Sequence, residues 1–467
     1  MIGIGTGPKI KQKSTGNGRE STPIKEAHLR FISVFHSCVL LSAMVTTFNQ
    51  TLGTSKRICH FSFIISHSRR MRIGLIHYNS WPTVGGVETV LRQQAILMAA
   101  AGHDVTIICG SGKNFAAGVA TVVIPELNIS SPAVKAAQAE VWDGQPAAAY
   151  LGLLDTLRSK ITPLIQNLGC LIAHNLMTMP FNLAATQVIA ELAEAGPYIL
   201  AWTHDLAAGN QDYSLPRNRI IDMVREKHPN IRYVAVSETR AKEFRTLMGS
   251  EVDAVVPNAL NLSTVLGLTP EAEALLNEVD TQAILLLYPT RILPRKNLEL
   301  ALQILLALNG LGQSAYLFIT GAANEYNPEA QTYLSGLKRQ IAELGMLDRV
   351  IWVNERFDVD EHQLRSLYLA ADALLFSTRQ EGFGLPLLEA AAFRLPIFCS
   401  DIEPLRSNLP SNAVTFDLRT SPRNIGETII AALKSDRAFA SRKKLLMNNS
   451  AQRLYLEKIA PLLGSPL

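Results

Sequence analysis

The sequence has few cysteines, and none of them is placed for a zinc site or a redox pair. Five cysteines are spread over 467 residues, at Cys38, Cys59, Cys109, Cys170 and Cys399. They form no CxxC pair and no Cys/His spacing typical of zinc, and an odd, dispersed set is typical of reduced thiols. The composition therefore argues against a disulfide-built secreted domain and predicts a cytoplasmic location.

A hydrophobic run long enough to cross a membrane is also missing. The apolar run Phe31–Phe48 is interrupted by Ser, His and Thr, and a membrane span needs about 20 mostly apolar residues. It lies within residues 1–70, which hold ten Lys/Arg and two Asp/Glu. We interpret residues 1–70 as an extension that is disordered or not native, and Met71 as a candidate start of translation. Membrane association and a targeting segment remain alternatives.

The rest of the chain lacks a basic surplus. Beyond residue 70 it holds 34 Lys/Arg and 38 Asp/Glu, so this part is mildly acidic. Nothing here suggests a nucleic-acid-binding face, and we predict no nucleic-acid partner. The chain is long enough for two domains, and 48% of its residues are hydrophobic, which allows a sizeable core.

From Met71 onward, short apolar strands alternate with amphipathic helices, a pattern typical of parallel sheets covered by helices. In the first half, a helix is predicted over Val87–Ala101. The strands predicted there are Arg72–His77, Asp104–Cys109, Cys170–Ala173, Tyr198–Thr203, Arg232–Val236 and Val252–Val256. The segments Lys113–Ala148 and Ala207–Arg219 show no pattern that we can assign, and we treat them as loops.

The same pattern then restarts after a predicted linker, Leu260–Asp280. A helix is predicted over Asn297–Leu308, and helices over Ile425–Leu463 end the chain. The strands predicted in this half are Ala283–Pro289, Ala315–Thr320, Arg349–Val353, Ala373–Phe376 and Pro396–Cys399. We therefore predict two Rossmann-like, doubly wound α/β domains facing a cleft, over residues 71–265 and 266–447. Residues 448–467 are predicted as a C-terminal helix that can pack back on the first domain.

The sharpest motif is the stretch from Glu381 to Glu389 (EGFGLPLLE), which follows a predicted strand and opens a helix. Gly382 and Gly384 let the backbone come close to a ligand, and a helix N-terminus suits a phosphate. Carboxylates are natural acceptors for sugar or ribose hydroxyls. The alternative is an exposed loop acid followed by an ordinary helix acid.

Two further stretches suit a phosphate. Arg291 and Lys296 follow the first strand of the second half and put positive charge where a diphosphate can sit; a solvated basic loop is the alternative. Gly85 and Gly86 lie between the first predicted strand and its helix, where they permit close approach of a phosphate or form a plain turn. His204 ends a predicted strand, where it can bind a sugar hydroxyl or serve a structural role.

Together these residues resemble glycosyltransferase family four, often called glycosyl transferases group 1, from about Met71 to the C-terminus. The strongest piece is the E-x7-E pattern of Glu381 and Glu389. The stretches Leu367–Asp372 (LYLAAD) and Pro396–Asp401 (PIFCSD) resemble the patterns that flank it in the family.

The resemblance implies a retaining, metal-independent hexosyltransferase of the GT-B fold, which needs no cofactor and uses a nucleoside-diphosphate sugar as its substrate. The acceptor would be a carbohydrate, a lipid-linked molecule or a small molecule, held by the first domain, and peripheral membrane contact stays open. The implied catalytic residues are Glu381 at the transferred sugar, Arg291 and Lys296 at the diphosphate, and His204 near the sugar. The implied donor-binding residues are Gly85, Gly86, Gly321, Gly382, Phe383, Gly384, Leu385 and Glu389.

Some positions depart from the family pattern. Arg394 and Asn354 stand where Gly is usual, which puts loop geometry and the nucleotide-base pocket in doubt but not the reaction class. No DxD-like metal site accompanies the motifs, and we interpret Asp401 and Glu403 as ordinary loop acids. Cationic side chains and helix ends can stabilise a leaving diphosphate in place of a metal.

Two other kinds of protein fit part of the pattern. A nucleotide-dependent oxidoreductase needs G-x-G-x-x-G after the first strand, and this chain has only Gly85-Gly86 there. A non-catalytic or hydrolytic sugar-nucleotide-binding protein on the same fold predicts loss of Glu381, Arg291 or Lys296, yet all three are present.

Overall fold

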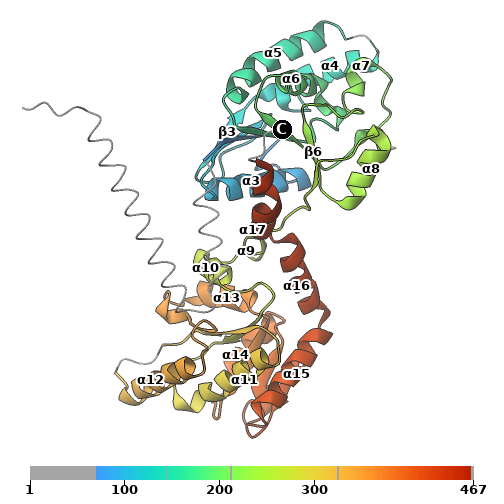
Figure 1. Cartoon of the computed structure of the whole chain (residues 1–467). Coiled ribbons are helices and arrows are strands. Elements are labelled where there is room, and N and C mark those ends of the chain that lie inside the picture. Colours follow the sequence, from blue (N-terminus) through green and yellow to red (C-terminus); the bar gives the residue numbers. More distant parts are fainter. Residues whose placement is uncertain (1–69, 145, 211–212, 323–325, 464–467) are drawn as a thin grey trace, which may run out of the picture. The chain divides into compact units, whose positions relative to one another are not determined.

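A computed structural model describes residues 70–144, 146–210, 213–322 and 326–463. Apart from Arg70, the extension predicted over residues 1–70 lies outside these ranges. Within them, every helix is too short or too polar to cross a membrane. The described chain contains two sheets, each flanked by helices (Figure 1).

The first sheet has seven strands, all parallel, in the order β3-β2-β1-β4-β5-β6-β7. They are β1 (Arg72–His77), β2 (Asp104–Cys109), β3 (Val119–Val123), β4 (Cys170–His174), β5 (Tyr198–Thr203), β6 (Arg232–Ala235) and β7 (Ala254–Val255). The strand order reverses between β1 and β4. In doubly wound sheets, ligands bind at this switch point, beyond the carboxyl ends of the strands.

Helices cover both faces of this sheet. They are α3 (Gly86–Ala100), α4 (Pro132–Trp142), α5 (Ala148–Ile165), α6 (Leu183–Leu192), α7 (Arg219–Asp222) and α8 (Glu238–Met248). Successive strand residues point to opposite faces, so Leu75 joins the core on the side of α3 while Ile76 joins the core on the side of α5 and α6. Both β1 side chains are fully buried.

The segment Lys113–Ala148, which we expected to be a loop, is ordered into β3, a 3₁₀ turn at Pro125–Leu127 and α4. The start of α4 carries a recognisable sequence pattern, because Ser131 accepts a hydrogen bond from the N–H of Val134 and Pro132 occupies the first helical position. The segment Ala207–Arg219 holds only a 3₁₀ turn, Ala207–Gly209, before α7.

The second sheet repeats the design with six parallel strands in the order β10-β9-β8-β11-β12-β13. They are β8 (Ile284–Tyr288), β9 (Ala315–Ile319), β10 (Val350–Trp352), β11 (Ala373–Phe376), β12 (Ile397–Ser400) and β13 (Ala413–Phe416). Its helices are α10 (Pro270–Glu278), α11 (Leu298–Gly310), α12 (Pro328–Glu343), α13 (Glu361–Ala370), α14 (Leu385–Ala392) and α15 (Pro422–Ser435). The predicted fold class of two Rossmann-like α/β domains is confirmed.

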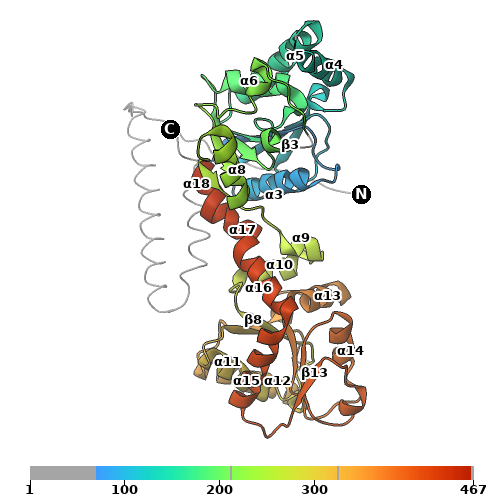
Figure 2. The same cartoon turned by 90° about the vertical axis from the view of Figure 1, so that its right-hand side faces the viewer.

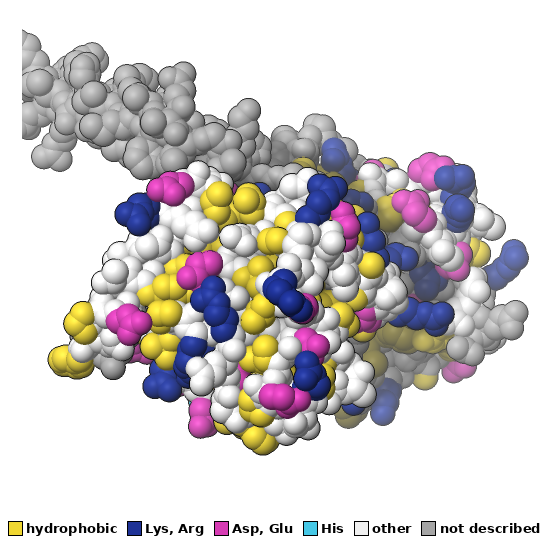
Figure 3. Space-filling view, turned by 90° about the horizontal axis from the view of Figure 1, so that it is seen from below, with side chains coloured by type: hydrophobic (Ala, Val, Ile, Leu, Met, Phe, Trp, Pro, Cys, Tyr) yellow, Lys and Arg dark blue, Asp and Glu magenta, His cyan; other side chains and the backbone are white. Residues whose placement is uncertain are grey.

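The predicted linker is partly a folded element of the second domain. After the short helix α9 (Leu262–Leu266), α10 packs against α13, and its Leu275 joins the core around the second sheet. In Figure 1 and Figure 2, α11 and α15 lie side by side in this domain, in agreement with their packing contacts. The face seen in Figure 3 mixes acidic, basic and apolar side chains and gathers no single charge.

The last helices contact both domains in turn. Helix α16 (Arg437–Asn449) is anchored to the second domain by buried Lys443, whose Nζ lies 2.6 Å from Asp372. The end of α16 then pairs with the segment that leads from the first domain to the second, where Leu260 N–H donates to the Asn449 carbonyl at 2.7 Å. Beyond it, α17 (Ala451–Leu454), a π-helical turn (Tyr455–Ile459) and α18 (Ala460–Leu463) follow, and Tyr455 packs in the first domain's core.

Candidate functional site

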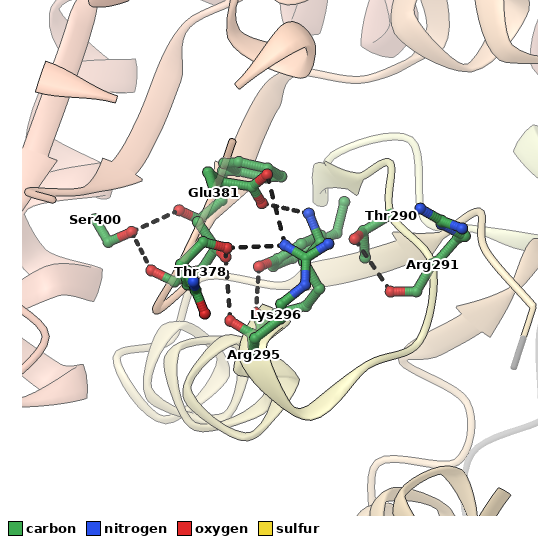
Figure 4. A network of polar contacts seen from close by, with 10 residues as sticks. Thr290, Arg291, Arg295, Lys296, Thr378, Glu381 and Ser400 are labelled. Carbon is green, nitrogen blue, oxygen red and sulfur yellow. Dashed lines mark hydrogen bonds and ion pairs between the residues drawn. The ribbon is translucent and has the colours of Figure 1, made fainter. Parts of the chain in front are cut away.

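The candidate site in the second domain is built by the two segments that follow β8 and β11, on either side of the switch point of the sheet. Lys296 ends a 3₁₀ turn, Pro294–Lys296, after β8, and Glu381 lies in the loop between β11 and α14. The two residues are 85 positions apart in the chain, yet Lys296 Nζ donates directly to Glu381 Oε1 (Figure 4).

This ion pair is largely withdrawn from water. Lys296 is 8% exposed, and its ammonium also lies 5.2 Å from the centre of the Phe376 ring. Burial lowers the pKa of Lys296, while the adjacent Glu381 acts against that shift. A buried charge needs a partner, so Lys296 and Glu381 stabilise each other in the free protein. Arg295 adds a second cation, 3.8 Å from the Glu381 carboxylate.

Backbone contacts hold the two segments together. Asn297 donates from its amide to the Ser377 carbonyl at 3.1 Å, and the Ser377 hydroxyl donates back to the Asn297 carbonyl at 3.0 Å. Asn297 adopts φ 51°, a left-handed conformation that Asn tolerates better than most residues. Arg295 also donates to the Gln380 carbonyl at 2.9 Å. The positions of Lys296 and Glu381 are therefore set by the backbone of both segments.

Arg291 lies apart from this pair. Its side chain is exposed and points away from Lys296 and Glu381 (Figure 4), and it makes no ion pair with the described residues. Its charge is still close enough to help lower the pKa of Lys296. The structure thus brings Lys296 and Glu381 together and leaves Arg291 as a free cation beside them.

Gly321, predicted to bind the nucleotide, has a structural constraint of its own. It follows β9, where a Cβ atom would stand 1.6 Å from the Thr290 carbonyl oxygen and 2.7 Å from Arg291 Cα. Only glycine allows these two backbones to approach so closely. Gly321 therefore fixes the segment that carries Arg291, whatever else it contacts.

The two glycines of the Glu381 loop, Gly382 and Gly384, differ in how much space surrounds their backbone. A Cβ on Gly382 would meet nothing within 4 Å, so the space beside this backbone is open. Gly384 has φ 91° and would clash with Leu405, so it is needed for the turn. It precedes α14 without a side-chain cap. Pro386 has no N–H and Leu387 N–H donates to the Gly384 carbonyl at 2.9 Å, so the Leu385 N–H is the one left for an anion in the first turn. Phe383 and Leu385 flank Gly384, 47% and 60% exposed.

Glu389 lies one turn into α14 and is held by a residue that we did not predict. The buried Tyr368 hydroxyl, on α13, donates to Glu389 Oε2 at 2.6 Å. The Tyr368 ring stacks on Phe393 at a centroid distance of 5.2 Å. One carboxylate oxygen of Glu389 is thus fixed by the protein, and Oε1 remains for a ligand.

A pocket of about 640 Å³ lies beside Arg291 and Gly321. Its lining includes Thr290, Arg291, Gly321 and Asn354. The Asn354 side-chain oxygen is buried without a hydrogen-bond partner, which is unusual for a buried polar atom. Asn354 therefore offers an unused acceptor in this pocket. The other residue at a family glycine position, Arg394, adopts φ 55°, the left-handed conformation that glycine favours.

In the first domain, His204 belongs to a buried group of histidines at the carboxyl ends of neighbouring strands. His204 Nε2 lies 3.1 Å from His174 Nδ1, and His77 Nδ1 donates to the His174 carbonyl at 2.9 Å. Burial lowers the pKa of His204 to about 3 and that of His174 well below its usual value. His204 is therefore neutral at physiological pH. Asn175 supports it by accepting its backbone N–H at 2.8 Å.

Gly85 precedes α3, and Gly86 is the first residue of this helix. A Cβ on Gly86 would meet nothing within 4 Å, whereas one on Gly85 would stand 2.1 Å from Glu88 Oε2. Gly85 therefore leaves room for the Glu88 carboxylate above it. Glu88 was not predicted, and its neighbour is His77, whose Nε2 lies 3.8 Å from Glu88 Oε1.

The acidic pair Asp401 and Glu403 is engaged by one arginine. Arg406 Nε lies 2.9 Å from Asp401, and Arg406 Nη1 lies 3.4 Å from Glu403. Throughout the described ranges, no three His, Cys, Asp or Glu side chains are grouped to hold a metal ion.

Several residues that organise the site escaped sequence reasoning. They are Tyr368, Ser377, Asn297, His77, His174 and Glu88. For His77, His174 and Ser377 a usable pattern existed, since each ends or follows a strand beside the switch point. Tyr368 and Glu88 lie on helix faces, and only the folded chain shows what they contact.

A family model and several known proteins match parts of this chain. The family model described as "Glycosyl transferases group 1" matches residues 276–452, which include every strand of the second sheet. The mannosylglucosylglycerate synthase of Thermotoga maritima is 22% identical over 361 residues, covering 73% of this chain and 82% of that protein. The O-antigen chain mannosyltransferase RfbU of Salmonella typhimurium is 33% identical over 82 residues, or 18% of this chain and 22% of that protein.

Solved structures of similar architecture include Anabaena HepE in complex with UDP and glucose, with TM-score 0.35, 16% identity and coverage of 85% of this chain and 100% of that chain. WaaG, a glycosyltransferase involved in lipopolysaccharide biosynthesis, gives TM-score 0.33, 17% identity and coverage of 84% and 100%. The two Rossmann-like domains and the family-model match define the class: the chain is a transferase enzyme, a glycosyltransferase.

Proposed function

We propose that this glycosyltransferase moves a hexose from a nucleoside-diphosphate sugar to an acceptor hydroxyl, with retention of the anomeric configuration and without a bound metal. Mannose is the first sugar to consider, because the relatives matched above are a mannosylglucosylglycerate synthase and a mannosyltransferase. The acceptor, by the same comparison, is a carbohydrate or a small glycoside.

The observation that carries the proposal is the buried Lys296–Glu381 pair beside the open backbone of Gly382 and the uncapped N-terminus of α14. A cation and a helix N-terminus suit a diphosphate, and a carboxylate suits a sugar hydroxyl. The pocket that contains Asn354 supplies space for the nucleoside, and Glu389 Oε1 supplies an acceptor for ribose hydroxyls.

The chemistry follows from these groups. The bond between the anomeric carbon and the donor phosphate oxygen breaks, and negative charge grows on the leaving diphosphate. Lys296 and Arg291 stabilise that charge, which is greater in the transition state than in the bound substrate. The acceptor hydroxyl oxygen bonds to the anomeric carbon from the same face, and its proton passes to the leaving phosphate oxygen. Glu381 holds the transferred sugar.

A nucleotide-sugar screen tests the proposal. UDP- and GDP-linked hexoses are compared by thermal shift, where a ligand at about 100 times its Kd stabilises by about 2.7 kcal/mol. Release of nucleoside diphosphate is then measured with the donor that binds. Lys296→Ala should lower kcat about a hundredfold, equivalent to about 3 kcal/mol. Its control is Lys338→Ala, which removes an exposed lysine of the same domain paired with Glu355.

Each outcome decides between the candidates. Equal turnover in folded Lys296→Ala and Lys338→Ala proteins contradicts the assigned site. Donor binding without sugar transfer to any acceptor favours the alternative, a hydrolytic or non-catalytic sugar-nucleotide-binding protein.

Metal independence has its own test. We expect turnover to survive EDTA, because Lys296, Arg291 and the α14 N-terminus provide the positive charge that the leaving diphosphate needs. Turnover is measured with the same donor before and after chelation. Complete loss with EDTA, restored by Mg²⁺ or Mn²⁺, contradicts this part of the proposal.

A further inference from the structure

A second polar pocket lies along the first two turns of α3, in the first domain. It has a volume of about 290 Å³, and we call it the α3 pocket after the helix that supplies most of its polar lining. Its lining includes Trp81, Glu88, Thr89, Arg92 and Gln93. Part of the remaining lining comes from Asn261 and Thr264, beyond the first sheet.

Two opposite charges in this pocket are placed to pair but do not. Glu88 and Arg92 are four residues apart on α3, a spacing at which a carboxylate and a guanidinium usually form an ion pair. Neither forms an ion pair with the other, and Arg92 forms none with any described residue. Both charged groups therefore remain available to a ligand.

The aromatic neighbours of Arg92 explain why it stays away from Glu88. The Arg92 guanidinium carbon lies 5.9 Å from the Trp81 ring centre and 5.5 Å from the Phe115 ring centre, so cation–π contacts hold it against both rings. Its Nε is buried without a hydrogen-bond partner, as is Oε1 of Gln93. Buried polar atoms are rarely left unsatisfied, and two beside one pocket indicate an absent polar ligand.

The neighbour of the Glu88 carboxylate is His77, whose Nε2 lies 3.8 Å from Glu88 Oε1. The Glu88 side chain is 14% exposed and makes no hydrogen bond within the described part of the chain. His77 donates from Nδ1 to the His174 carbonyl, and burial lowers the pKa of His77. Neutral His77 therefore turns the lone pair of Nε2 toward Glu88. Because this acceptor lies 3.8 Å from Glu88 Oε1 and offers it no hydrogen, the carboxylate that lines the pocket remains free to accept hydroxyl hydrogens from a ligand.

We propose that the α3 pocket binds the sugar of an acceptor that carries an anionic group, a carboxylate or a phosphate. Neighbouring sugar hydroxyls donate to the Glu88 carboxylate, and the anionic group binds the Arg92 guanidinium. Trp81, 36% exposed, provides the flat apolar surface against which the sugar ring rests. This inference rests on the proposed function, because it takes the first domain as the acceptor-binding domain.

Binding of three sugars to the full chain tests the inference. The probes are D-glucuronate, glucose 6-phosphate and neutral methyl glucoside, and their affinities are measured by saturation-transfer NMR in the absence of a sugar donor. A hydrogen bond to a charged group is worth enough to predict that at least one anionic sugar binds about tenfold or more tightly than methyl glucoside. Which of the two binds distinguishes the carboxylate from the phosphate.

Variants assign the preference to Arg92. Arg92→Met keeps an apolar stem against the Trp81 and Phe115 rings and should abolish the preference for the anionic sugar, whereas Arg92→Lys should keep part of it. Glu88→Gln should weaken all three sugars together. The control is Arg158→Met, which removes an exposed arginine of α5 in the same domain.

Three results overturn the inference: no anionic sugar binds, methyl glucoside binds as tightly, or the preference survives in folded Arg92→Met. These outcomes are separate from the proposed function, which fails if the wild type releases no nucleoside diphosphate from any nucleotide sugar.

Discussion

Substitution of Gly321 by alanine tests how the second domain's site is built. The added Cβ would stand 1.6 Å from the Thr290 carbonyl oxygen and 2.4 Å from its carbon. Both atoms belong to the backbone, so no side chain can rotate to relieve the overlap. The segment after β8 must move away from β9, and it carries Arg291 and leads to Lys296.

The expected cost is that of overpacking a tight contact, about 1–3 kcal/mol of unfolding free energy. For a domain of this size, that lowers the melting temperature by about 2–4 °C per kcal/mol. Calorimetry gives the stability, and nucleotide-sugar binding gives the effect on the site, which we expect to weaken because Arg291 is displaced. The matched control for stability, though not for binding because Gly382 borders the proposed donor site, is Gly382→Ala, where a Cβ would meet nothing within 4 Å.

The comparison between the two alanines decides the interpretation. Gly382→Ala should stay within about 0.5 kcal/mol of the wild type, as surface substitutions usually do. Equal stability of the two variants would refute the close approach of Gly321 to Thr290. A stable Gly321→Ala protein that nevertheless loses nucleotide-sugar binding would assign Gly321 to direct ligand contact.

Three further predictions follow from single contacts. Tyr368→Phe should raise the KM for the sugar donor about tenfold at nearly constant kcat, because the Tyr368 hydroxyl orients Glu389. Tyr333→Phe removes a similar hydrogen bond to Glu299 and should leave the KM unchanged, so equal kinetics of the two variants would contradict this role. Arg394→Gly should raise the unfolding free energy by about 0.5–1 kcal/mol, because glycine adopts the left-handed backbone conformation of this position without strain. Arg394→Ala should bring no such gain, and urea unfolding measures both variants. Because burial lowers the folded pKa of His77, His174 and His204 below the unfolded value of 6.5, the unfolded chain binds more protons, and the free energy of unfolding should fall as pH drops from 6.5 toward 5. His204, whose folded pKa is about 3, should contribute up to about 1.4 kcal/mol per pH unit to this loss; an unfolding free energy that is flat from pH 7 to pH 5 would refute the prediction.

Much of the fold follows from the sequence because parallel strands buried on both faces are continuous apolar runs. The run Ala283–Pro289 predicted β8 to within a residue at each end, and Arg72–His77 predicted β1 without error. The strands that were missed, β3 and β13, lie at the edges of their sheets. The side chains of β3 and β13 are only partly buried, so apolar and polar residues show little alternation along these strands. Their sequences therefore resemble those of loops.

Less of the candidate site follows from the sequence, because local pattern indicates which loop carries a residue but not what that residue contacts. Lys296 and Glu381 were each placed in a loop beside a strand end, and strand order explains why the loops meet. Their direct contact depends on Asn297 adopting a left-handed conformation, which no periodicity reveals. The role of Gly321 likewise depends on a backbone 30 residues away.

The Lys296–Glu381 contact also changes how substitutions of either residue must be interpreted. Each charge is buried and satisfied mainly by the other, so removing one leaves an uncompensated charge that costs stability as well as any catalytic role. Glu381→Ala therefore lowers activity by two routes, because the sugar loses its acceptor and Lys296 loses its partner. Glu381→Gln keeps an oxygen that can accept from Lys296 and isolates the role of the carboxylate charge. In the free protein the pair keeps the site formed before a ligand arrives, and binding replaces one charged partner of Lys296 by another, the diphosphate.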